Sequence, residues 1–90
     1  MIYSKSIAYA LVKSETTCWK DDELISEEMT LEQCAEYCAN EIGCHYFTSG
    51  VNEYDGYCYW SKVTIEKGIP VCRGGWDEDK DFNFFKLFRK

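Results

Sequence analysis

Six cysteines in a chain of only 90 residues place the strongest constraint on how this protein can fold. Three of them, Cys34, Cys38 and Cys44, lie within the segment TLEQCAEYCANEIGCHYF, residues 30–47. A single domain of this length buries roughly 60–65% of the surface of its unfolded chain, and so small a core often needs covalent support. The even cysteine count fits three disulfides, which can pair in many ways. Persistent disulfides predict an oxidising compartment, so we expect a secreted or cell-surface protein.

Other uses of cysteine fit the spacing less well. Structural zinc sites are usually built from two C-x2–4-C knuckles or from paired Cys and His. Here Cys58 and Cys72 stand alone, and His45 is the only histidine. The C-x-x-C pattern of redox enzymes is absent. The sequence therefore predicts disulfide crosslinks, with no metal site and no cofactor.

The residues for catalysis are also poorly arranged. A nucleophilic active site needs a Cys or Ser, a base and a group that orients the base. His45 is the only candidate base, and it follows Cys44 on an expected strand, where neighbouring side chains face opposite sides. Carboxylates are plentiful, but none forms a pair in the apolar setting that would raise one pKa. We expect a protein that is not an enzyme.

Acidic residues outnumber basic ones, 16 to 10, which gives a formal charge of −6. Nucleic-acid binding requires clustered Lys and Arg, so we expect no nucleic-acid partner. We also expect no membrane span, because the sequence has no apolar stretch of sufficient length. The aspartates of DEDKD, residues 77–81, alternate as in a calcium loop. Phe82 and Phe88, however, occupy the positions where that loop requires Gly and Glu, so the segment is interpreted as a solvated turn.

One helix is clearly indicated, from Leu31 to about Glu41. Thr30 is a good N-cap, and Gln33 follows three residues later to complete a capping box. A stop is expected at Gly43. Cys34 and Cys38 are four residues apart and share one helix face, a geometry that favours two different bonding partners over a mutual bond.

Alternating and aromatic-rich segments predict strands at residues 2–13, 44–50, 57–62 and 81–88, the middle two forming a hairpin. The first strand has larger side chains on one face, namely Tyr3, Ile7, Tyr9 and Leu11. Its other face carries Ala8, Ala10 and Val12, and we expect the helix to pack on this smaller face. The last strand has Phe on both faces and should be covered on both sides. Residues 17–29 are polar and acidic and are interpreted as a loop.

Aromatic residues make up 17% of the chain, a high share for a soluble domain, and they could fill a small core or in part form a recognition surface. Trp60 and Phe85 are expected in the core. Aromatic side chains that stay exposed can stack on sugar rings or anchor protein interfaces. The candidate ligand-binding residues are those clustered around the hairpin and the Gly74–Gly75 turn: Tyr54, Tyr57, Tyr59 and Trp76.

The pattern TLEQCAEYC…GCHYF…YCYW resembles the PAN/Apple module, and the closing DFNFFKL is similar to its last strand. The resemblance implies an α+β fold in which an antiparallel β-sheet wraps around one α-helix. It also implies bridges Cys34–Cys58 and Cys38–Cys44 from the helix, which leaves Cys18 and Cys72 for a third. We thus expect one PAN/Apple-like domain over residues 1–90, in which residues 1–17 precede the cysteine framework.

The same resemblance implies an extracellular recognition or adhesion module that binds a protein or carbohydrate and performs no chemistry. A second hypothesis is a structural subunit of an extracellular fibre, coat or matrix. This subunit would self-associate through the N-terminal strand, which lies outside the cysteine framework and could extend a neighbour's sheet.

Overall fold

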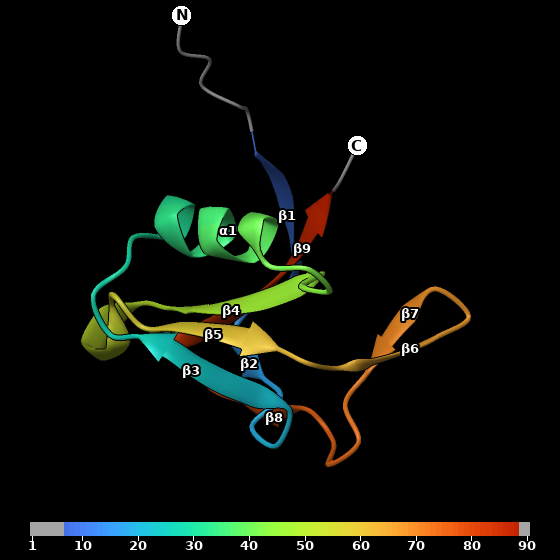
Figure 1. The fold of residues 1–90 in the computed structure, drawn as a ribbon. Helices are drawn as coiled ribbons and strands as arrows, with labels where there is room; N and C mark the ends of the chain where they lie inside the picture. The colour runs from blue at the N-terminus through green and yellow to red at the C-terminus, as the bar shows by residue number, and fades with distance from the viewer. Residues whose placement is uncertain (1–6, 89–90) are drawn as a thin grey trace, which may run out of the picture.

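A single helix packs on a five-stranded antiparallel sheet in the part of the chain that the structure describes (Figure 1). The structure is a computed structural model, and residues 7–88 are described. Along the chain the elements are β1 (Ala8–Lys13), β2 (Thr16–Thr17), β3 (Asp22–Ser26), α1 (Leu31–Asn40), β4 (Tyr46–Gly50), the 3₁₀ helix η1 (Asn52–Tyr54), β5 (Cys58–Ser61), β6 (Thr64–Glu66), β7 (Ile69–Val71), β8 (Asp77–Glu78) and β9 (Phe82–Phe88). The prediction of an α+β fold with one helix, antiparallel sheets and three disulfides is confirmed.

The main sheet has the strand order β1-β9-β4-β5-β3, and every neighbouring pair is antiparallel. β4 and β5 form the predicted hairpin, in which Thr48 lies opposite Tyr59. β9 runs between β1 and β4 and places Phe84 on one face of the sheet and Phe85 on the other. Both phenylalanines are buried, so the last strand is covered on both sides as predicted.

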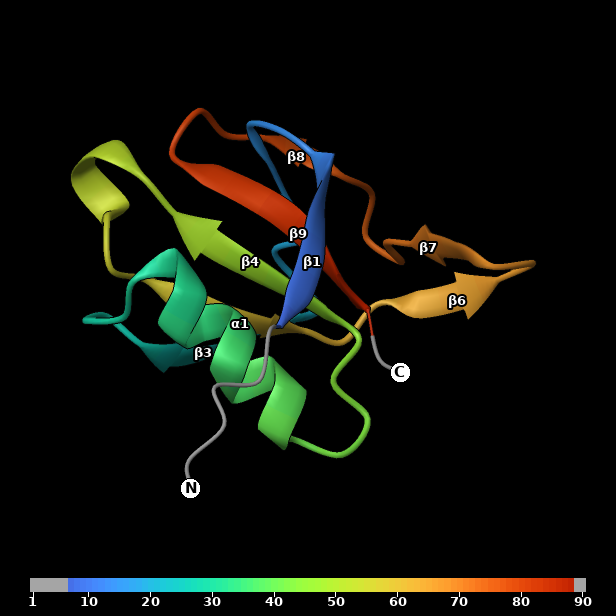
Figure 2. The same ribbon diagram turned by 90° about the horizontal axis from the view of Figure 1, so that it is seen from above.

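The helix begins with the capping box that the sequence indicates. The hydroxyl of Thr30 accepts a hydrogen bond from the backbone N–H of Gln33, whose side chain accepts one from the N–H of Thr30. The buried face of α1 carries Cys34, Ala35 and Cys38. This face packs on the sheet with a cluster that includes Phe47, Phe85 and Leu87. Figure 2, seen from above, shows α1 lying across this face of the sheet.

The opposite face of the main sheet is partly covered by β2 and β8, which form a small antiparallel sheet of their own (Figure 1). On this face the ring of Tyr46 stacks on that of Phe84 with centroids 5.2 Å apart. Trp76 meets Phe84 edge-on at 4.9 Å. The molecule therefore has two apolar layers, one on each side of the sheet.

Three disulfides crosslink the chain: Cys34–Cys58, Cys38–Cys44 and Cys18–Cys72. The first two are the pairs that the resemblance implied, and the third is the pair that was left by elimination. All six cysteines are buried. The first two attach α1 to β5 and to the segment that leads into β4. The third lies on the far side of the sheet and joins the segments that follow β2 and β7.

β6 and β7 form a hairpin that projects away from the main sheet (Figure 2). Its turn contains Lys67 and Gly68, both with positive φ angles, which is the conformation that suits a tight two-residue hairpin turn. Ile65 and Ile69 are both exposed on this hairpin.

Two expectations from the sequence are wrong. Residues 17–29 are not a loop throughout, because β3 pairs there with β5 at one edge of the sheet. The strand escapes notice because its sequence, DELIS, is short and half polar, as edge strands often are. The helix also does not pack on the alanine face of β1, since Ala8 and Ala10 are exposed. The larger Ile7 and Tyr9 face the helix-side core, where they bury more apolar surface.

The predicted strand over residues 2–13 is observed from Ala8 to Lys13. Its first part, residues 2–6, lies outside the described residues. No helix within residues 7–88 has the length and apolar character that crossing a membrane requires.

Candidate functional site

Three of the four candidate aromatic residues lie together. The rings of Tyr54 and Tyr57 have centroids 5.0 Å apart, and those of Tyr57 and Tyr59 are 6.3 Å apart. Phe82 of β9 closes the group, at 5.0 Å from Tyr54 and 5.7 Å from Tyr59. The four rings form a continuous aromatic surface on the face of the sheet away from α1.

Trp76 lies elsewhere on this side of the sheet. Its indole packs on Phe84, and the ammonium nitrogen of Lys13 lies 5.0 Å from the ring centroid. Trp76 thus has two partners within the protein and is only partly exposed. The structure does not group it with the three tyrosines.

A pocket of about 270 Å³ opens beside the aromatic surface. Its lining residues lie in or just after five elements, β2, η1, β5, β8 and β9: Thr17, Trp19, Tyr54, Tyr59, Asp77, Asp79 and Phe82. Two of the predicted residues, Tyr54 and Tyr59, line it directly, whereas Tyr57 supports them from behind. The volume is just below the roughly 300–1,000 Å³ of sites for drug-sized ligands, so it suits one side chain or one sugar ring.

Five of the lining residues are not among the candidates from the sequence: Thr17, Trp19, Asp77, Asp79 and Phe82. Trp19 is the exposed aromatic side chain among them. It is 65% exposed, unusually high for a tryptophan, and stands at the mouth of the pocket. The available signal was its position directly after Cys18, because a disulfide fixes the backbone of the adjoining residue. The turn is held further by the N–H of Asp21, which donates to the carbonyl of Cys18 at 3.0 Å.

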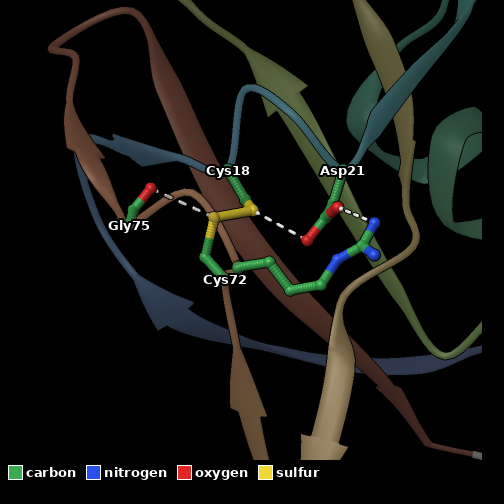
Figure 3. Close-up of polar contacts among 5 residues, drawn as sticks. Cys18, Asp21, Cys72 and Gly75 are labelled. Carbon is green, nitrogen blue, oxygen red and sulfur yellow. Dashed lines mark hydrogen bonds and ion pairs between the residues drawn. A yellow bond between two sulfur atoms is a disulfide. The ribbon is translucent and has the colours of Figure 1, made fainter.

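The Cys18–Cys72 bridge joins two segments that each lie near lining residues of the pocket. Figure 3 shows this bridge with Asp21 and Gly75 beside it. The carboxylate of Asp21 lies 3.4 Å from the Cys18 sulfur and accepts a hydrogen bond from the Arg73 guanidinium at 3.0 Å. The Cys72 sulfur lies 3.1 Å from the carbonyl oxygen of Gly75. Because a disulfide sulfur carries no proton, the two sulfur contacts are close packing and not hydrogen bonds.

Cys18, Asp21 and Cys72 are also close enough together to hold a metal ion. Metal binding by cysteine requires a thiolate, and both sulfurs are bonded to each other. The Asp21 carboxylate is already paired with Arg73. The cluster is therefore a structural anchor for the pocket wall.

Glycine allows Tyr54 to approach the sheet. A side chain at Gly50 would collide with the carbonyl oxygen of Tyr54, so only glycine permits η1 to fold against the end of β4. The backbone of Gly50 also donates to the carbonyl of Tyr57 at 2.9 Å. These contacts fix the position of Tyr54, which lines the pocket.

Asp77 and Asp79 belong to the outer wall of the pocket, which is formed by lining residues within 17–19 and 77–79. Asp77 is exposed on β8, whose backbone pairs with Thr17 of β2. Asp79 is held more firmly, because its Oδ1 accepts a hydrogen bond from the N–H of Asp81 at 3.0 Å. Its own N–H donates to the carbonyl of Glu15 at 2.8 Å.

A chain of hydroxyl groups connects the pocket with the interior of the sheet. Thr17 and Ser61 donate hydrogen bonds to the two carboxylate oxygens of Asp22, at 2.8 and 2.7 Å. Because the hydroxyl proton of Ser61 is used there, the 2.7 Å bond between Ser61 and Thr48 has Thr48 as its donor. Thr17 is therefore committed to Asp22, which leaves its side chain without a free proton for a ligand.

Burial raises the pKa of Asp22 from its ordinary value of 3.8 to about 6. The charge of Asp21 adds to the increase, while the hydrogen bonds from Ser61 and Thr17 oppose it. A carboxylate in this position favours its protonated form more than an exposed one does.

Two tyrosine hydroxyls of the aromatic surface, those of Tyr57 and Tyr59, remain protonated at neutral pH. Burial raises the pKa of Tyr59, and a hydrogen bond to Glu27 raises the pKa of Tyr57. Both hydroxyls therefore act as hydrogen-bond donors, whereas the two aspartates of the wall act as acceptors.

The candidate nucleophile and base do not form a catalytic pair. Cys44 is bonded to Cys38, so it has no free thiol. His45 lines a second, smaller pocket of about 200 Å³, together with Trp60 and Lys62. The Lys62 ammonium lies over the Trp60 ring, 4.6 Å from its centroid. Trp60, predicted in the core, packs against the helix-side core but is only partly buried.

In comparisons with family models, curated proteins and solved structures, no match to the chain is found.

Proposed function

We propose that the protein is an extracellular recognition or adhesion module that binds a protein or carbohydrate ligand without chemical conversion. The observation that carries this proposal is the pocket between Trp19, Tyr54 and Tyr59, which is edged by Asp77 and Asp79. Aromatic faces with adjacent carboxylates offer both apolar contact area and hydrogen-bond acceptors. This combination is typical of surfaces that recognise a protruding side chain or a sugar ring.

The fold supports a PAN/Apple-like classification. The helix lies on an antiparallel sheet, and two disulfides join it to the hairpin region, as the resemblance implies for this family. We include β1 in the same domain, because Tyr9 packs edge-on against both Phe47 and Phe85 of the helix-side core.

The disulfides support the proposed location. Three buried bridges in 90 residues persist only where thiols are oxidised, as outside the cell. Secretion or display at the cell surface would provide that setting and would expose the pocket to ligands.

The ligand contacts that we propose differ from the initial set in two positions. Tyr54 and Tyr59 remain direct contacts, Tyr57 becomes a supporting residue, and Trp19 replaces Trp76. The exchange follows from the lining of the pocket, which includes Trp19, and from the contacts that Trp76 already makes with Phe84 and Lys13.

A binding screen on glycan arrays and on arrays of extracellular protein domains tests the proposal. The parent chain is compared with Trp19→Ala, which removes an exposed pocket residue, and with Ile42→Ala as a matched control. Ile42 is 97% exposed in the loop after α1 and lies outside the pocket. We expect a ligand that the parent and Ile42→Ala bind equally and that Trp19→Ala binds less well. Equal binding by all three, or no binding to either array, would count against the pocket as the recognition site.

Self-assembly is the second candidate function, and it is favoured by the outer edge of the sheet. β1 pairs with β9 on one side only, among the strands described. Leu11 and Phe88 beside this edge are 54% and 49% exposed. An open strand edge with apolar neighbours can pair with the same edge of a second copy.

Light scattering over a range of concentrations tests this second candidate. The parent is compared with Ala10→Lys, which places a charge on the exposed face of β1. Self-assembly predicts association of the parent that Ala10→Lys weakens. A parent that stays monomeric at the highest concentration would exclude it.

A further inference from the structure

The charged side chains that line the pocket are all negative. Two carboxylates, Asp77 and Asp79, line it, and no lysine, arginine or histidine is among the described lining residues. The chain neighbours of the lining residues carry both signs, since Glu78 follows Asp77 while Lys20 follows Trp19 and Lys80 follows Asp79. The negative charge of the pocket thus comes from its two lining carboxylates. The pocket therefore attracts cations and repels anions.

The aromatic walls favour the same kind of ligand. The face of an aromatic ring carries partial negative charge, so a cation within about 6 Å of the ring centroid is attracted, most strongly by tryptophan. Trp19, Tyr54 and Tyr59 provide three such rings around one space. The protein already has this type of contact elsewhere, where Lys13 lies over Trp76 and Lys62 over Trp60.

The size of the pocket and its hydrogen-bonding groups restrict the ligand further. A volume of about 270 Å³ admits a single side chain. The carboxylates can only accept hydrogen bonds, and an ammonium group is a pure donor with three protons. The Thr17 hydroxyl is already committed to Asp22, while the Tyr59 hydroxyl remains as a neutral donor. The two carboxylates are the charged groups of the lining, and they favour an ammonium group over a neutral sugar.

We propose that this pocket binds a protonated alkylamine, of the kind that a lysine side chain on the surface of a partner protein presents. The methylene stem lies against the aromatic rings of Trp19, Tyr54 and Tyr59, and the ammonium group is directed to Asp77 and Asp79. This inference rests on the proposed recognition function and specifies its ligand as a cationic side chain of a protein.

A titration followed by ¹H–¹⁵N NMR tests the inference with two matched probes. The first is Nα-acetyl-lysine N-methylamide, and the second is the norleucine analogue, which has a terminal methyl group in place of the ammonium. A third probe, methyl glucoside, represents a neutral sugar. We expect the lysine probe to shift the indole N–H signal of Trp19 and to bind roughly tenfold more tightly than the norleucine probe, from the combined cation–π and ion-pair contributions.

Two charge-neutralising variants separate the pocket from the general negative charge of the protein. Asp77→Asn removes one pocket carboxylate but retains the backbone pairing of β8 with β2. Glu66→Gln makes the same change on the exposed β6–β7 hairpin. Asp77→Asn should raise the dissociation constant of the lysine probe about two- to fivefold, which is the effect expected from the loss of one exposed ion pair. Glu66→Gln should leave the dissociation constant unchanged.

The outcomes distinguish the inference from the proposed function. Equal binding of the lysine and norleucine probes, or equal weakening by the two variants, would overturn the cationic ligand. Binding of methyl glucoside with shifts at Trp19, but no response to the lysine probe, would overturn the inference and leave the recognition function standing. If no probe shifts a pocket residue and the arrays also give no ligand, both proposals fail.

Discussion

Cys18 and Cys72, 54 residues apart in the sequence, are joined by a disulfide on the side of the sheet away from α1. Each of the two bonded residues lies close in sequence to residues that line the pocket: Thr17 and Trp19 on one side, Asp77 on the other. The bridge thus connects both segments of the outer wall. The pocket depends on this covalent link more than on either of the two disulfides of the helix.

Removal of the Cys18–Cys72 bridge by a double Cys→Ala replacement should destabilise the protein more than removal of Cys38–Cys44. A disulfide stabilises the folded state because it lowers the entropy of the unfolded chain, and the effect grows with loop length. The Cys18–Cys72 bridge spans 54 residues and should contribute about 4 kcal/mol to the free energy of unfolding. The Cys38–Cys44 bridge spans 6 residues and should contribute about 2 kcal/mol. Urea denaturation of the two double variants measures the free energies of unfolding. The opposite ranking would contradict the loop-length argument.

The stability of the protein should depend on the protonation of Asp22. Its pKa is raised on folding from 3.8 to about 6, so the folded state binds the proton more tightly than the unfolded state. This contribution to stability is fully present below pH 3.8 and is lost as the pH rises through about 6. Asp22→Asn should therefore flatten the pH dependence of unfolding across that window.

Chemical denaturation at a series of pH values measures this effect. The control is Glu66→Gln, which removes an exposed carboxylate on the β6–β7 hairpin and should keep the slope of the parent. A slope for Asp22→Asn equal to that of the parent would show that Asp22 does not carry the dependence.

Gly50→Ala should be strongly destabilising and should also distort the pocket. The added methyl group would collide with the carbonyl oxygen of Tyr54, so η1 would have to move away from β4. We expect a loss of about 1–3 kcal/mol, as for overpacking at a buried site. Gly43→Ala is the matched control. Its added methyl group meets no neighbour, and only the positive φ angle of 89° opposes it.

Thermal denaturation ranks the two glycine variants, and ligand binding reports on the pocket. Gly50→Ala should lose stability and binding together, while Gly43→Ala should lose some stability at most. Full binding by a folded Gly50→Ala would mean that Tyr54 does not need its observed position.

The helix and the hairpin could be predicted because their signals are local. The capping box of Thr30 and Gln33 fixes the start of α1, and short aromatic runs flank a polar turn in β4 and β5. β3 was missed because an edge strand needs no continuous apolar face. The prediction for β1 was wrong about the face that packs toward the helix. It assumed that the helix would pack on the smaller side chains, which allow close approach. The structure places Ile7 and Tyr9 there instead, because these larger side chains bury more apolar surface.

The pocket could be predicted only in part. Tyr54 and Tyr59 were found because they lie near each other in the sequence, within the hairpin. Trp19 and Asp79 join them through the pairing of β2 with β8 and through the Cys18–Cys72 bridge. No short-range pattern encodes such a meeting of distant segments, and the local signal at Trp19 was limited to its position directly after Cys18.

The most direct test of the account is a map of NMR chemical-shift changes when the best ligand from the array screen is added to the intact protein. The account predicts that the largest changes fall on Trp19, Tyr59 and Asp77, and that Trp19→Ala abolishes them. Changes confined to the helix or to the β6–β7 hairpin, with the signals of the pocket unmoved, would contradict it.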